Sequence, residues 1–150
     1  MKNSIKLMAL IAIIPAFLNS CDKNEHPEIT IHELGYENTK TVIAGSDLHL
    51  DAEIMAPQKI SSIQLIIHSE EEHAANMPMK AKNMNQEITE WKVDSIYTKG
   101  YVGVKNAEFH EHLNVPLTAE SGHYHVHIKV TDMEGNQTMR EDDIEVQAAN

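Results

Sequence analysis

Histidine is the residue type in this sequence that most clearly could do chemistry. The chain holds 10 histidines, and two groups of them occupy alternate positions: His110 and His112, and His123, His125 and His127. Alternate residues of a β-strand point to the same face of a sheet, so each group sets imidazoles side by side on a rigid base. Imidazole nitrogen is a ligand for borderline transition-metal ions such as Zn and Cu. The spacing therefore predicts a metal site without naming the metal.

Two other interpretations of these histidines stay open. The solvent face of a strand must be polar, and histidine is an acceptable choice there, so the two groups could be ordinary surface. Several histidines could also donate to neighbouring carboxylates and tune the acidic surface at roughly pH 6 to 7.

The elements that must position these side chains are predicted to be short β-strands. Apolar and polar residues alternate in most segments after Glu28, which is the period of a half-buried strand. The segments that show it, separated by turn signals, are 29–31, 48–55, 60–68, 91–97, 109–115, 124–130 and 144–146. About seven strands without a long segment of helical period predict an all-β fold, an Ig-like antiparallel β-sandwich over residues 28–147. Glu111 would point inward, so we expect the fifth strand to begin or bulge there.

An Ig-like topology divides the candidate ligands between two patches. The sixth strand would lie between the third and the seventh, so the preferred metal site comprises His123, His125, His127, His68, Glu141 and Asp143. The fifth strand would lie beside the second, so a second patch comprises His110, His112 and His49. The first patch is preferred because it is rich in nitrogen and has carboxylates within reach.

A further group of metal-binding residue types lies between the third and fourth predicted strands. Met77, Met79 and Met84 follow His68 and His73, and thioether sulfurs are soft ligands that select Cu(I). Pro78 and the lack of an apolar stripe favour a loop without fixed geometry over a copper site.

The remaining composition restricts the class of function. The sequence has no G-x-S-x-G motif, no H-E-x-x-H motif and no glycine-rich phosphate loop, so no enzymatic activity is expected. The formal net charge is −11. Removal of residues 1–20 would leave ten basic residues against 23 acidic ones, a net charge of −13. Such a surface repels phosphate backbones, which excludes nucleic acid as a partner, and it attracts cations.

The N-terminal segment predicts export. Lys2 and Lys6 precede an apolar run over residues 7–17, which is shorter than the roughly 20 residues that a membrane-spanning helix needs. Residues 1–20 are therefore predicted to be a signal peptide. The segment Leu18-Asn19-Ser20-Cys21 resembles a bacterial lipobox. That resemblance implies that Cys21 becomes a lipidated N-terminus, that residues 21–27 form a tether, and that the protein is anchored in the cell envelope, at the outer membrane.

One strand and its following turn resemble a known domain type. Gly122 to Asn136 follow the pattern G-x-Y-x-V-x-I-x-V-x-D-x-x-G-N, which is similar to the penultimate strand and hairpin turn of bacterial Ig-like domains. With the lipobox-like segment, it makes the chain similar to a family of uncharacterised Bacteroidetes-type lipoproteins that hold one Ig-like domain of unknown function. The resemblance implies that Tyr124 packs at a sheet corner and that Gly135-Asn136 turns the chain into the last strand.

Two functions follow as hypotheses. The first is a lipid-anchored envelope module that captures or transfers Cu or Zn through surface histidines, handing the ion to an outer-membrane importer or another envelope protein. The alternative is an accessory or adhesion-type Ig-like module that binds an envelope protein or a glycan, with the histidines as ordinary surface.

Overall fold

The chain alternates short strands with tight turns throughout the part that the structure describes. The computed structural model describes residues 25–70 and 88–149. The elements run in the order β1 (Glu28–Leu34), the 3-10 turn η1 (Tyr36–Asn38), β2 (Thr41–Ile43), β3 (Asp47–Met55), β4 (Ile60–Ser69), β5 (Val93–Tyr97), β6 (Asn106–Asn114), β7 (Gly122–Asp132) and β8 (Gln137–Gln147). The predicted signal peptide, Cys21 and the methionine segment lie outside the described residues.

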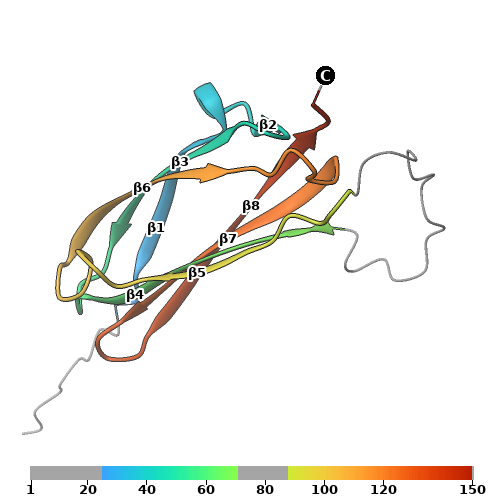
Figure 1. Ribbon diagram of the computed structural model, residues 1–150. Helices are drawn as coiled ribbons and strands as arrows, with labels where there is room; N and C mark the ends of the chain where they lie inside the picture. Colours follow the sequence, from blue (N-terminus) through green and yellow to red (C-terminus); the bar gives the residue numbers. More distant parts are fainter. Residues whose placement is uncertain (1–24, 71–87, 150) are drawn as a thin grey trace, which may run out of the picture.

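The strands form the two sheets of a β-sandwich, as predicted (Figure 1). One sheet has the order β1-β3-β6 and the other has the order β2-β8-β7-β4-β5. The predicted neighbours are confirmed, because β7 pairs with β4 and β8, and β6 pairs with β3. Each of these pairs is antiparallel, and the histidines therefore divide between the outer faces of two different sheets.

The inward face of each strand supplies the core. Leu48, Leu50, Ala52 and Ile54 alternate along β3 and are fully buried, while the polar residues between them face outward. Burial of one large aliphatic side chain contributes about 1.5 to 3 kcal/mol, which is enough to hold the register of the strand. A slip by one residue would bury the outward histidine and carboxylates and expose the core residues.

The expectation that the fifth strand begins or bulges at Glu111 is wrong. β6 pairs with β3 without a register shift from Asn106 to Asn114, and Glu111 points inward at the margin of the core. Tyr97 and Tyr101 lie close to this carboxylate. Burial raises the pKa of Tyr97, and the charge of Glu111 and a hydrogen bond with its side chain raise it further. The hydroxyl of Tyr97 therefore satisfies the inward carboxylate of Glu111. The alternation of residues along one strand cannot predict such a partner.

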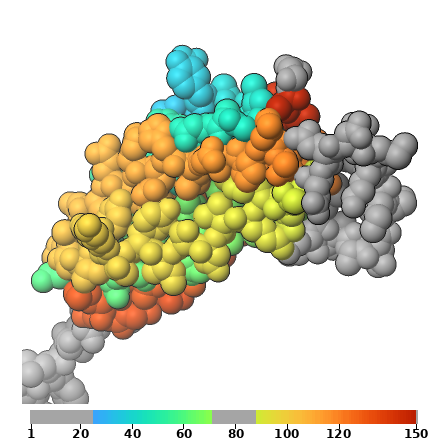
Figure 2. All heavy atoms as spheres, viewed as in Figure 1, coloured from blue at the N-terminus to red at the C-terminus, as the bar shows by residue number. Residues whose placement is uncertain are grey.

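The side of the sandwich between β5 and β6 is closed by aromatic packing. Phe109 makes edge-to-face contacts with Tyr97 and Tyr101, with ring centroids 5.0 and 5.9 Å apart. In Figure 2, β5 and β6 lie side by side and cover the core on this side. The edge of β6 thus carries outward histidines on a well-packed base.

One strand was not predicted. β2 has three residues and pairs in parallel with Glu145 to Gln147 of β8, which is too short for an alternating pattern to be visible. The predicted corner is present, because the Tyr124 hydroxyl donates a hydrogen bond to the carbonyl of Glu120 at 2.8 Å. In the part of the chain that the structure describes, no helix has the length and apolar character to cross a bilayer.

Candidate functional site

The second predicted patch forms a compact histidine tripod on the outer face of the three-stranded sheet. His49 of β3 pairs in register with His112 of β6, and His110 lies two residues away on the same face. The ring centroids of the three side chains are 4.8 to 5.0 Å apart. The Nε2 atoms of His110 and His112 lie 3.1 Å apart. Each of the three residues can place one ligand nitrogen within 4.8 Å of the other two.

Two carboxylates contact the Nδ1 atoms of two imidazoles of this tripod. Nδ1 of His49 lies 3.0 Å from the Glu33 carboxylate, and Nδ1 of His112 lies 2.5 Å from the Asp47 carboxylate. The hydrogen bond with His49 lowers the pKa of Glu33 below its ordinary value. A carboxylate that accepts from one ring nitrogen fixes the tautomer, so that Nε2 keeps its lone pair, and it orients the ring for an ion.

The geometry of the tripod suits a transition-metal ion. Two nitrogens bound to one tetrahedral Zn ion at about 2.0 to 2.1 Å are separated by about 3.3 Å, and the two Nε2 atoms of β6 are already near that separation. His110 and His112 are exposed and His49 is half-buried. The fourth coordination position of a tetrahedral ion bound here would face solvent.

The sequence did not indicate Glu33 or Asp47 as parts of the site. Glu33 reaches His49 because β1 has a register shift between Ile31 and Glu33, which turns the side chain of Glu33 toward the outer face. Asp47 lies at the first residue of β3, on the same face as His49. Of the two carboxylates, only Asp47 could be placed by alternation. The sequence signal for it is its two-residue spacing from His49.

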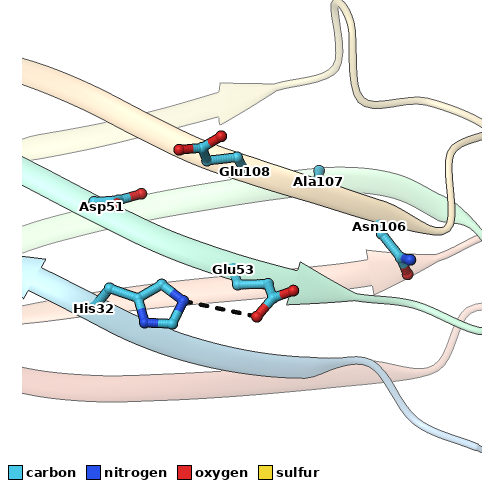
Figure 3. Close-up of a pocket in the computed structure, with 6 residues that line it drawn as sticks. All are labelled: His32, Asp51, Glu53, Asn106, Ala107 and Glu108. Carbon is cyan, nitrogen blue, oxygen red and sulfur yellow. Dashed lines mark ion pairs between the residues drawn. The ribbon is translucent and has the colours of Figure 1, made fainter.

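An acidic cavity of about 300 Å³ lies beside the tripod on the same face. Figure 3 shows Asp51 and Glu108 from neighbouring strands, with an ion pair between His32 and Glu53 at 3.7 Å. Asp51 is the in-register partner of His110. The negative potential of this cavity adjoins the tripod and favours the approach of a cation.

The preferred patch of the sequence analysis lies on the outer face of the five-stranded sheet. His125 Nδ1 lies 2.7 Å from Asp143 and 3.6 Å from Glu141, and these three side chains can place one ligand atom each within 4.8 Å of the others. His68 and His127 form a second pair, with their Nε2 atoms 3.1 Å apart. The structure thus brings five of the six predicted residues together.

His123 and His127 occupy different environments on this face. His123 is exposed beside Glu145 and outside the group. His127 is only 15% exposed, and its Nδ1 has no hydrogen-bond partner among the described residues. Burial lowers the pKa of His127 below its ordinary value, against the smaller opposing effect of Glu141.

The fold and these surfaces define the class of the protein: an Ig-like β-sandwich domain that displays histidine clusters on the outer faces of both sheets. The chain belongs to the family described as a domain of unknown function (DUF4625), whose model matches residues 19–147. This agrees with the uncharacterised family expected from the sequence. No curated protein matches the chain at a significant level.

Several solved structures match this chain over most of its length at low sequence identity. OgpA from Akkermansia muciniphila is 12% identical, with a TM-score of 0.49 over 85% of this chain and 31% of OgpA. The GspB Siglec domain is 16% identical, with a TM-score of 0.49 over 84% of this chain and 59% of that one. Murine CRIg is 12% identical, with a TM-score of 0.37 over 83% of this chain and 99% of that one. This chain therefore spans about a third of OgpA, and the identities are too low to carry a function from any of these proteins.

Proposed function

We propose that this protein is a lipid-anchored binding module of the cell envelope that captures or transfers a transition-metal ion, Cu or Zn, through the tripod of His49, His110 and His112. The observation that carries the proposal is the convergence of three imidazoles, with the Nε2 atoms of His110 and His112 3.1 Å apart and with carboxylates engaging Nδ1 of His49 and His112. Orienting carboxylates of this kind raise the basicity of histidine ligands and are typical of metal sites.

The ligand types of the tripod and its exposure to solvent support reversible binding of an ion that can pass to a recipient. Imidazole donors suit Zn and Cu(II), and the tripod has no thiolate or thioether that would select Cu(I). Three protein ligands with an outward fourth side resemble the open class of metal site, because a closed structural site takes four protein ligands. A recipient such as an outer-membrane importer could supply the fourth ligand and withdraw the ion. The proposal is one of binding and includes no catalysis.

The attachment to the membrane is part of the same proposal. A lipid on Cys21 and the short tether that follows it would keep the domain at the outer membrane. The high negative charge of the chain would concentrate cations around it.

The first test is a Zn²⁺ and Cu²⁺ titration of the full chain in detergent, with competing chelators. We expect His112→Asn to weaken binding at the tripod by about tenfold or more, since one of three ligands and the contact to Asp47 are lost. His32→Asn is the matched control, because His32 lies on the same outer face but contacts Glu53 instead of the tripod. Equal affinity losses in the two variants, or no loss in either, would overturn the proposal.

One observation favours the alternative function, the recognition of an envelope protein or glycan. β6 has nine residues and is an edge strand that pairs only with β3 in the described part of the chain. A free edge of this length can accept a strand from a partner. This function becomes the better account if the metal titration leaves the β6 imidazoles unchanged.

A further inference from the structure

The outer face of the five-stranded sheet contains a line of imidazoles whose protons can be assigned one after another. Nδ1 of His68 lies 3.2 Å from the carbonyl oxygen of Ser69. A carbonyl oxygen can only accept, so this nitrogen carries the proton. In neutral His68 the Nε2 atom is therefore an acceptor.

The next ring along the line follows from the first. Nε2 of His127 faces Nε2 of His68 at 3.1 Å, and because the latter atom accepts, Nε2 of His127 must donate. Neutral His127 then has a bare lone pair on Nδ1. That atom is buried and has no hydrogen-bond partner among the described residues.

The lone pair of His127 Nδ1 points toward a negative group. Oε2 of Glu141 lies 3.7 Å away, and the other oxygen of the same carboxylate lies 3.6 Å from Nδ1 of His125. Two electron-rich atoms that face each other repel unless a cation lies between them. An ion bound at about 2.0 to 2.2 Å from each atom would fit in a separation of 3.7 Å with an ordinary coordination angle.

We propose that His125, Glu141 and Asp143, whose ligand atoms lie within 4.8 Å of one another, form a second, independent metal site on the outer face of the five-stranded sheet, with Nδ1 of His127 beside Glu141 as a further ligand. It binds through Nδ1 atoms and carboxylate oxygens, and binding releases the proton that His125 Nδ1 donates to Asp143 in the metal-free protein. The site takes a divalent ion of borderline hardness such as Zn²⁺, because mixed nitrogen and oxygen donors do not suit Cu(I). His68 is a positioning residue that fixes the tautomer of His127 through the Ser69 carbonyl.

This site does not depend on the tripod. The two clusters lie on the outward faces of opposite sheets, and stacked sheets are about 10 Å apart before the side chains are added. The proposed function and the second site can therefore fail or succeed separately.

The binding test counts Zn²⁺ ions on the full chain in detergent, with a chromogenic chelator as competitor. We expect two ions per native chain. His112→Asn should keep only the ion of the second site, and Glu141→Gln should keep only the ion of the tripod. Glu145→Gln is the control for the latter, since Glu145 is on the same strand and face but pairs with His123. If Glu141→Gln binds Zn²⁺ with the native stoichiometry and affinity, the second site is excluded, whatever the tripod does.

A spectroscopic test examines the proton assignment directly. Long-range ¹H–¹⁵N correlation spectra of the metal-free chain at neutral pH should show His127 as the Nε2–H tautomer. Addition of Zn²⁺ should shift Nδ1 of His125 and His127 and leave the exposed ring of His123 unchanged. A His127 ring that carries its proton on Nδ1, or that is already doubly protonated, would overturn the assignment, because no lone pair would then face Glu141.

Discussion

The orientation of single imidazoles decides whether the histidines of this protein can bind an ion. In the tripod, Glu33 and Asp47 each engage an Nδ1 atom, so that Nε2 faces the neighbouring ring. On the five-stranded sheet the two ring nitrogens exchange roles. The contacts of His68 engage Nε2 of His127, so Nδ1 of His127 is the atom available to an ion. The same residue type therefore offers different nitrogens on the two faces of the molecule.

A prediction at this scale concerns the carboxylate behind His49. Glu33→Gln should weaken metal binding at the tripod by roughly 10- to 100-fold without removing a ligand, because an amide fixes and polarises the imidazole less strongly than a carboxylate does. The measurement is a competition titration with Zn²⁺. Glu53→Gln is the matched control, since its contact is with His32. Unchanged affinity in Glu33→Gln would mean that Glu33 does not support the site.

At the scale of elements, tight turns and the register shifts in β1 and β4 set the register that brings the candidate ligands together. The turn between β7 and β8 is organised by Asp132, which is 1% exposed. Its carboxylate accepts hydrogen bonds from the backbone N–H groups of Glu134 and Asn136 and from the side chain of Asn136, at 2.8 to 2.9 Å. Burial raises the pKa of Asp132, but these hydrogen bonds together lower it more, so the pKa lies below its ordinary value.

We expect Asp132→Ala to lower the free energy of unfolding by about 1 to 3 kcal/mol, because the turn loses its buried acceptor and leaves donors unpaired. The loss should depend on pH. Since the folded protein lowers the pKa of Asp132, its stabilising effect is fully present above the unfolded pKa of about 3.9 and is lost as the pH falls through the lower folded value. Urea unfolding of the native chain and the variant at several pH values measures this. A stability difference that grows in acid would contradict the assignment.

At the scale of the whole molecule, the core of the sandwich separates two histidine-containing surfaces. The three-stranded sheet presents three nitrogens, and the five-stranded sheet presents nitrogens mixed with carboxylates. Under the proposed function, capture and transfer of an ion can therefore use two surfaces with different ligand types. The strongly negative net charge would act on both surfaces in the same direction.

The proposed anchor gives a prediction for the whole chain. Cys21→Ser should abolish the lipid modification at this position and the lipid-dependent cleavage before it, because a serine cannot form the thioether that carries the lipid. Fractionation followed by mass spectrometry of the N-terminal peptide measures both the location and the modification. A native N-terminal peptide without lipid would show that the anchor is absent.

The fold class could be predicted from the sequence because the outward and inward residues of a strand alternate regardless of what surrounds the strand. Leu48 and Leu50 had to face a core, and His49 between them had to face outward. The pairing of β6 with β3 and of β7 with β4 and β8 followed from the Ig-like topology and placed the histidines in two patches. The short β2 and the unbroken pairing of β6 through the inward Glu111 were missed, because each depends on a partner that is distant in the sequence.

By itself, the sequence determined the strands and their outward histidines, since both depend on a local period of two, and the Ig-like topology inferred from it divided the histidines between two sheets. Only the tertiary structure decided which residues of each patch converge. The register shift in β1 brings Glu33 to His49, and the in-register pairing of β3 with β6 joins His49 to His112. The distances between ligand atoms depend on contacts between strands and on side-chain orientation, and alternation along one strand cannot specify either. For the same physical reason, the bare Nδ1 of His127 became visible only once Ser69, His68 and Glu141 had been placed around it.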